Sequence, residues 1–145
     1  MSVGRICIRD VDLAEPNESV QIAARRMNSR KVGTLMILDS NSRPVGILSD
    51  RDLAIRVVGE GLNALETTVH DVMSKAPESV CEDTAIEAAL CRMRAGPYRR
   101  LPVVDNDGKL VGIVSLDDIL DLLSEEFNEI GRLVRHESPA SLAER

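Results

Sequence analysis

The sequence predicts an α+β fold made of two copies of one β-α-β-β-α unit, and three observations support this prediction. The phrase VGILSDRDL at residues 45–53 returns as VGIVSLDDI at residues 111–119. The same offset, which takes position 45 to position 111, holds without a gap from Ala23 to Asp52. In each copy a segment of helical periodicity precedes two short β-branched runs and a second helical segment. Because a fixed period of this length marks a duplicated unit, we expect both copies to fold alike and to pack against each other.

The first copy contains these elements in order. We expect a strand at Val11–Ala14, a helix near Val20–Ser29, a strand at Thr34–Leu38, a turn at Ser40–Arg43, a strand at Pro44–Leu48 and then a shorter helix. Gly59 and Gly61 end that last helix.

The second copy repeats the order with a clearer helical pattern. Apolar residues at Ile86, Ala89, Leu90 and Met93 follow the i, i+3, i+4, i+7 spacing of a helix with one buried face. Thr84 is the expected N-cap, and Gly96-Pro97 stops the helix. We expect strands at Ser79–Cys81, Leu101–Asp105 and Lys109–Val114, with a turn at Asn106–Gly108. From Ser115 a long helix carries an apolar stripe of Ile119, Leu120, Leu123, Phe127, Ile130 and Val134.

These patterns predict the domain boundaries. The first unit spans residues 1–62, a linker spans 63–77, and the second unit with its extended C-terminal helix spans 78–135. Residues 136–145 lose apolar periodicity and are expected to form a flexible tail.

Composition excludes several classes of function. A formal charge of −6 and only two aromatic residues, Tyr98 and Phe127, argue against a nucleic-acid partner. No apolar run approaches the length needed to cross a bilayer, and no secretory leader is recognisable, so we expect a cytoplasmic protein without a membrane partner. The only histidines are His70 and His136, and no cysteine is placed beside a base, so the sequence predicts neither an enzyme nor a metal site.

The three cysteines, Cys7, Cys81 and Cys91, are interpreted mainly as buried thiols. Their number is odd and none is in CxxC spacing, which argues against a disulfide framework. Cys81 and Cys91 lie ten residues apart in one unit, so a redox pair is an open alternative.

The repeated Gly-x-x-Ser-x-x-Asp phrase has two interpretations. Ser49 with Asp52, and Ser115 with Asp118, stand where a strand changes to a helix, so each pair could form a capping box. The same geometry could hold a phosphate on the serine and the helix N-terminus, and two ribose hydroxyls on the aspartate. Glycine in a strand, at Gly46 and Gly112, indicates either a closely approaching ligand or tight packing.

The duplicated unit resembles the CBS-domain pair, also called a Bateman module. The residues that carry the resemblance are RRLPVVD at 99–105, GIVSLDD at 112–118, GILSDRD at 46–52 and VHDVMS at 69–74. The resemblance covers roughly residues 8–127. It implies two units packed sheet to sheet about a pseudo-twofold axis, with two clefts for adenosine compounds. In these clefts the motif serine contacts phosphate and the motif aspartate holds the ribose.

Carried onto this chain, the resemblance predicts a set of ligand-binding residues in the two clefts. They are Gly46, Ser49, Arg51, Asp52, Arg100, Gly112, Ser115 and Asp118. The copies differ in charge, since Arg51 is replaced by Asp117, and Arg99-Arg100 stand where the first copy has Gly33-Thr34. We therefore expect unequal affinities for phosphate in the two clefts.

The predicted function is regulatory. We expect the chain to sense AMP, ADP, ATP or a related adenosyl compound such as S-adenosylmethionine, with no required cofactor, and to act in trans on an unidentified protein client. The alternative is a ligand-free dimeric interaction scaffold, because the apolar stripe of the last helix extends beyond what its unit needs to cover. A homodimer contact along this stripe agrees with the dimers that the resemblance implies.

Overall fold

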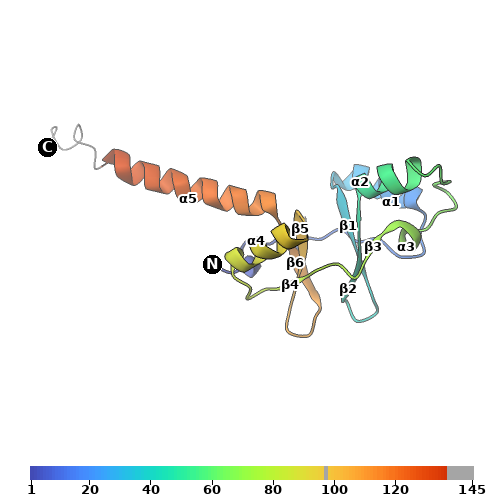
Figure 1. The fold of residues 1–145 in the computed structure, drawn as a ribbon, viewed down its shortest axis with the longest axis horizontal. Helices are drawn as coiled ribbons and strands as arrows, with labels where there is room; N and C mark the ends of the chain where they lie inside the picture. The colour runs from blue at the N-terminus through green and yellow to red at the C-terminus, as the bar shows by residue number, and fades with distance from the viewer. Residues whose placement is uncertain (97, 137–145) are drawn as a thin grey trace.

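The computed structural model describes residues 1–96 and 98–136, and these residues form two similar α+β units. Figure 1 shows a three-stranded sheet in each unit, with the two sheets in the middle of the molecule and helices on the outer sides. The last helix extends away from both units. The predicted α+β architecture of tandem units is therefore confirmed.

The first unit is built from the elements expected between residues 20 and 58. Helix α1 (Val20–Arg30) leads to strands β1 (Thr34–Leu38) and β2 (Pro44–Ser49), then helix α2 (Asp50–Leu53) and a π-helical turn η2 (Ala54–Val58). Gly59 is the C-cap of that turn, as expected.

The second unit repeats this order with a longer final helix. Strand β4 (Val80–Cys81) and helix α4 (Ile86–Ala95) precede strands β5 (Arg100–Val104) and β6 (Leu110–Ser115) and helix α5 (Leu116–His136). In the two hairpins the register is the same: Thr34 pairs with Ser49, and Arg100 pairs with Ser115. A register shift also occurs at the equivalent place, between Ile37 and Leu38 and between Val103 and Val104.

Some local predictions were wrong or fall outside the described residues. The strand expected at Val11–Ala14 is reduced to one isolated bridge between Leu13 and Met36. The N-cap of α4 is Ala85 and not the expected Thr84, and the side chain of Ala85 cannot accept a hydrogen bond. Pro97 and residues 137–145, most of the expected tail, lie outside the described part of the chain.

The two units exchange the segments that precede them. Residues 1–8, with the short 3-10 helix η1 (Val3–Arg5), attach to the second unit: Ile8 and Ile113 exchange two backbone hydrogen bonds of 2.9 Å. Helix α3 (Val69–Val72) and strand β3 (Ser74–Lys75) attach in the same way to the first unit, where β3 pairs with β2. The offset of the repeat takes Ile8 to Ser74, so the repeat extends upstream of the region where it is visible in the sequence.

These exchanged segments are part of the two hydrophobic cores. Val3 packs in the core of the second unit, although it precedes the first unit in the chain. Val69, Val72 and Met73, which fall in the expected linker, pack in the core of the first unit. Each unit therefore depends on apolar residues from the start of the other copy.

The hairpin turns provide direct contacts between the units. The Leu110 N–H donates to the Ser42 carbonyl at 2.9 Å, and Arg43 Nε donates to the Asp107 carbonyl at 3.2 Å. The residue equivalent to Leu110 is Pro44, which has no N–H. The second unit therefore donates this hydrogen bond to the first, and the equivalent bond from the first unit to the second cannot form. The sheets are thus held together at their turn ends.

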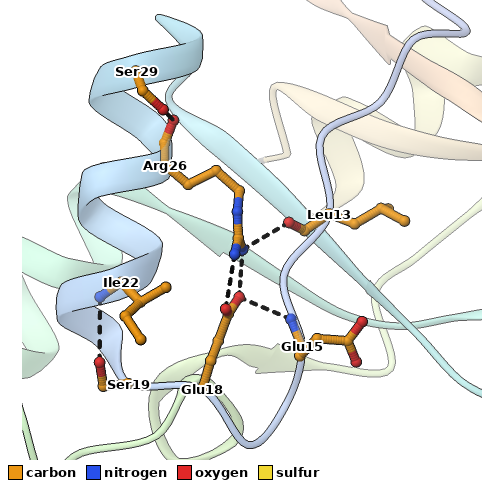
Figure 2. Close-up of polar contacts among 7 residues, drawn as sticks. All are labelled: Leu13, Glu15, Glu18, Ser19, Ile22, Arg26 and Ser29. Atoms are coloured by element: carbon orange, nitrogen blue, oxygen red, sulfur yellow. Dashed lines mark hydrogen bonds and ion pairs between the residues drawn. The ribbon is translucent and has the colours of Figure 1, made fainter.

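A partly buried ion pair fixes the chain before α1, as Figure 2 shows. Arg26 donates to both carboxylate oxygens of Glu18, and its Nη1 also donates to the Leu13 carbonyl at 3.0 Å. The same carboxylate accepts from the Glu15 N–H at 2.9 Å. The equivalent Arg92 donates to the Ser79 carbonyl at 2.7 Å, so one contact of this arginine is repeated in both units.

Candidate functional site

Both repeated phrases form capping boxes at the start of a helix. The Asp52 N–H donates to Ser49 Oγ at 3.1 Å, and the Ser49 N–H donates to Asp52 Oδ2 at 2.9 Å. Ser115 and Asp118 make the same two bonds at the same distances. The capping interpretation is therefore correct for both phrases. The capping bonds leave both carboxylates able to accept further hydrogen bonds, because each carboxylate oxygen can accept more than one.

The two motif glycines are explained by packing. A Cβ atom on Gly46 would lie 2.2 Å from the Met73 sulfur, and one on Gly112 would lie 2.6 Å from the Ile8 carbonyl oxygen. Both neighbours belong to the exchanged segments. Gly46 and Gly112 are buried and are not among the residues that line the two clefts described next. Of the two interpretations of these glycines, the structure favours tight packing.

The first cleft lies between the units and has a volume of about 690 Å³. One wall is the end of β2 and the start of α2, where Ser49, Arg51 and Asp52 stand. The segment from Ser74 to Glu78 forms a second wall, and Tyr98 to Arg100 contribute from the other unit. Four predicted site residues are thus brought together here: Ser49, Arg51, Asp52 and Arg100.

The second cleft is the counterpart of the first and is smaller, at about 270 Å³. Its lining residues stand at positions equivalent to those of the first cleft. Residues 8 and 10–12 take the place of residues 74–78, and Ile113 takes the place of Ile47. Lys31 to Thr34 take the place of Tyr98 to Arg100. Arg100 and Thr34 line both clefts. Ser115 and Asp118 are not among the lining residues of the second cleft, so the two clefts are not chemically equivalent.

Charge separates the clefts further. The first cleft is lined by four basic residues, Arg51, Lys75, Arg99 and Arg100. Its acidic residues are Asp50, Asp52 and Glu78. The second cleft has two basic residues, Lys31 and Arg100, and two acidic residues, Asp10 and Asp12. The first cleft is therefore the more favourable place for an anionic group.

Further contacts restrain the polar residues around the first cleft. Arg56 Nη2 lies 3.6 Å from Asp52 Oδ1, and its Nη1 donates to the Val72 carbonyl at 2.7 Å. Arg56 therefore pairs with Oδ1 of Asp52, whereas the capping bond uses Oδ2. The position equivalent to Arg56 is Leu122, which has no polar group that could pair with Asp118.

Cys7 lies near the second capping box. Its Sγ would be 2.9 Å from a Cβ on Gly112, and Asp118 is among the charges that act on the thiol. Burial raises the pKa of the Cys7 thiol, with Arg9 opposing this effect, so the group stays protonated near neutral pH. All three cysteines are free thiols, but only Cys7 is partly buried; Cys81 and Cys91 are exposed, so the expectation of buried thiols is wrong for these two.

Lys75 and Thr34 are among the residues of the first cleft that sequence reasoning missed. Lys75 belongs to the exchanged strand β3 and supplies a cation from the expected linker. Thr34 Oγ1 is buried and has no hydrogen-bond partner among the described residues. The offset of the repeat, applied upstream of Ala23, is the signal that would have paired residues 8–12 with 74–78.

The described part of the chain contains no group of three histidine, cysteine, aspartate or glutamate residues arranged to hold a metal ion. None of its helices combines the length and hydropathy that a bilayer span requires.

Comparison with known proteins identifies the fold. The sequence profile of the CBS domain matches residues 3–59 and again residues 69–125. The chain therefore belongs to the CBS-domain family and carries two CBS domains in tandem. The offset of the repeat takes residue 3 to residue 69 and residue 59 to residue 125, so the two matches cover equivalent residues. The first match begins inside the exchanged segment at residues 1–8.

One relative and two solved structures give the extent of the similarity. An uncharacterised protein of Methanopyrus kandleri is 38% identical over 122 residues, which are 84% of this chain and 62% of that protein, so the chain spans less than two thirds of that relative. CBSX2 in complex with AMP is 28% identical with a TM-score of 0.73, covering 86% of this chain and 97% of that one. The CBS domain pair of MJ0100, in complex with 5′-methylthioadenosine and S-adenosyl-L-methionine, is 25% identical with a TM-score of 0.77, covering 87% and 98%.

Proposed function

We propose that this protein is a regulatory module that binds a phosphorylated adenosine compound in the first cleft and acts in trans on a protein client. The observation that carries the proposal is the meeting of Ser49, Arg51, Asp52 and Arg100 on the walls of one cleft between the units. The similar chains of CBSX2 and MJ0100 are in complex with AMP and with adenosyl compounds, which supports the ligand class.

The charge of the cleft supports a ligand with phosphate. Arg51 and Arg100 can form charge-assisted hydrogen bonds to phosphate oxygens, and these are stronger than neutral ones. Asp52 has acceptor capacity for a pair of ribose hydroxyls beyond its capping bond. The Thr34 hydroxyl, which is unpaired within the described residues, also supports a polar ligand, because a buried hydroxyl without a partner costs free energy until something satisfies it. AMP, ADP and ATP all fit this description.

The test is calorimetric titration of nucleotide-free protein with AMP, ATP and S-adenosylmethionine. We expect Asp52→Asn to weaken AMP binding at least about tenfold, since it removes a charged acceptor for the ribose. Arg51→Asp, which copies the second phrase, should weaken ATP more than S-adenosylmethionine. Asp118→Asn is the matched control, because Asp118 makes the same capping bonds but does not line the second cleft.

Thermal unfolding without ligand separates binding from folding. If Asp52→Asn and Asp118→Asn lower the melting temperature equally, the two aspartates contribute equally to stability. Any difference in AMP affinity between the variants then reports the role of Asp52 in the first cleft. Equal losses of AMP affinity in both variants would contradict binding in the first cleft. No heat with any of the three compounds would overturn the ligand-binding proposal altogether.

The second candidate function is a ligand-free dimeric interaction scaffold. It is favoured by the exposure of the apolar side chains along α5, where Phe127 is 78% exposed. We propose that the protein is a homodimer in either case, since an apolar face of this size is unusual on a monomer. The cytoplasmic location expected from the sequence stays a prediction.

A further inference from the structure

Arg56 stands behind the first cleft and connects two of its walls. Its Nη1 donates to the Val72 carbonyl at 2.7 Å, and its Nη2 lies 3.6 Å from Asp52 Oδ1. Asp52 belongs to the wall at the start of α2, and Val72 ends α3, just before the wall that begins at Ser74. Arg56 itself is not among the residues that line the cleft. It can therefore influence a bound ligand through the residues that it holds, and not by touching the ligand.

The backbone around Arg56 differs between the two units. Residues 54–58 form the π-helical turn η2, whereas the equivalent residues 120–124 lie within the regular helix α5. A Cβ on Gly59, at the end of the turn, would lie 2.5 Å from a carbonyl oxygen of the turn, and the residue equivalent to Gly59 is Glu125. Single π-helical turns are rare and frequently occur at functional sites. The turn and its arginine are both absent from the equivalent part of the second unit.

The Asp52 carboxylate is restrained at both of its oxygens. Oδ2 accepts the capping bond from the Ser49 N–H, and Oδ1 pairs with Arg56. The Asp52 side chain is 18% exposed, so solvent screens this pair less than a pair on the open surface. A carboxylate held at two points keeps one orientation, and its remaining acceptor positions keep one direction. Binding a pair of ribose hydroxyls then requires less ordering of the carboxylate.

We infer that Arg56 is a positioning residue for the ribose of the ligand in the first cleft. The inference rests on the function proposed above and adds a residue that lies outside the repeated Gly-x-x-Ser-x-x-Asp phrase. Arg56 orients Asp52, the acceptor for the ribose hydroxyls. It also satisfies the Val72 carbonyl, which has no partner within α3 because it belongs to the last turn of that helix. This second bond holds the exchanged segment, and with it Lys75, against the wall that carries Asp52.

The experiment is calorimetric titration of the nucleotide-free starting protein and of Arg56→Leu with AMP and with 2′-deoxy-AMP. Leucine copies the equivalent residue of the second unit. We expect the variant to bind AMP about tenfold more weakly, which is the lower end of what the outer partners of ligating side chains contribute in metal sites. The loss for 2′-deoxy-AMP should be about twofold or less, because this compound lacks one of the hydroxyls that Asp52 holds. A purely structural role would weaken both compounds equally.

Two further variants test how Arg56 acts. Asp52→Asn combined with Arg56→Leu should bind AMP about as weakly as Asp52→Asn alone, because the charged acceptor that the arginine orients is then already absent. Additive losses would contradict an action through Asp52. Arg56→Lys keeps the charge but lacks the planar fork that reaches two partners, so its AMP affinity should be intermediate. Full affinity in Arg56→Lys would exclude the bond to the Val72 carbonyl as part of the mechanism.

Arg9→Leu is the matched control. Arg9 also donates to a backbone carbonyl of an exchanged segment, that of Gly4 at 2.8 Å, but it lines neither cleft. Its replacement removes the same charge and should leave the affinities for both compounds nearly unchanged. An equal loss of AMP affinity in Arg9→Leu would assign the effect to net charge and overturn the inference.

The outcomes distinguish this inference from the proposed function. If the starting protein binds AMP and Arg56→Leu binds both compounds unchanged, or with equal losses, the positioning role is overturned while the ligand-binding proposal stands. No heat with AMP on the starting protein would overturn both. Because the Arg56 side chain is 43% exposed, the variant should stay folded, and circular dichroism at the titration temperature checks this. If leucine unfolds the chain, the same comparison of the two compounds is made on Arg56→Lys.

Discussion

Ser42 and Gly108 occupy the same position in the two hairpin turns and show how one backbone conformation is met by different residues. Their φ angles are +62° and +80°, both in the left-handed region. Glycine adopts this region without strain, whereas serine has a Cβ that crowds the following carbonyl. A Cβ on Gly108 would meet only the Arg43 side chain, at 3.5 Å or more, so backbone strain is the main difference between the turns.

Exchanging the two residues therefore tests the strain directly. We expect Ser42→Gly to raise the free energy of unfolding by up to about 1 kcal/mol, and Gly108→Ser to lower it by a similar amount. Urea unfolding of both variants measures the effect, and the double variant should lie near the starting protein if the turns are independent. A loss of stability in Ser42→Gly would contradict the prediction and indicate that the serine side chain contributes more than its strain costs.

At the scale of elements, the repeated arginine explains how each first helix is joined to the segment before it. Arg26 and Arg92 each reach back 13 residues to a backbone carbonyl. Only Arg26 also has a largely buried carboxylate partner, Glu18, whereas Arg92 lies 3.5 Å from the exposed Glu78. The first unit therefore has the stronger attachment, because partly buried ion pairs are less screened by solvent.

The ion pair predicts a dependence of stability on pH. Hydrogen bonding from Arg26 holds the pKa of Glu18 below its ordinary value of 4.5, against the opposing effect of burial. A lowered pKa in the folded state means that the contribution is present above pH 4.5 and is lost as the pH falls through the folded value. We expect Glu18→Gln to lower the free energy of unfolding by about 1–2 kcal/mol at pH 7.

Melting temperatures between pH 7 and pH 3 measure this dependence. The gap between Glu18→Gln and the starting protein should narrow at the acidic end, since protonation of Glu18 then removes from the starting protein the charge that the variant already lacks. Glu15→Gln is the control, because Glu15 joins the hydrogen bonds of this ion pair through its N–H, and its carboxylate acts on Arg26 only through its charge. A gap that stays constant over the whole range would exclude the ionised carboxylate as its cause.

At the scale of the whole molecule, the exchange of segments makes the two units interdependent. Val3 and Val69 are equivalent positions, and each is 0% exposed. Each lies in the core of the unit other than the one that it precedes in the chain: Val3 in the second and Val69 in the first. A chain cut between the copies would therefore leave each unit without part of its core.

Truncating either valine should reveal this exchange. We expect Val3→Ala and Val69→Ala each to cost about 1–3 kcal/mol, because both create a cavity in a packed core. Native-state hydrogen exchange gives the location: Val3→Ala should raise exchange mainly in α4, β5 and β6, and Val69→Ala mainly in α1, β1 and β2. The reverse pattern, with Val3→Ala loosening only the first unit, would contradict the exchanged arrangement.

The sequence by itself determined the local elements and the class of fold. Helix α4, the hairpin strands and the start of α5 follow from apolar periodicity and turn residues within a few positions of one another. The repeat determined that Ser49-Asp52 and Ser115-Asp118 stand at equivalent junctions. Such patterns are readable because the residues that produce them are close in the chain.

Only the tertiary structure decided how the copies are joined and which predicted residues share a cleft. Ile8 pairs with Ile113 over a segment too short to show strand alternation, so no pattern in the sequence indicates it. Gly46 and Gly112 proved to accommodate the exchanged segments, and Asp118 does not line the second cleft although Asp52 lines the first. The physical reason is that a cleft between two units is formed by residues far apart in the chain. Equivalent residues of the two copies therefore meet different neighbouring side chains, and their environments are not the same.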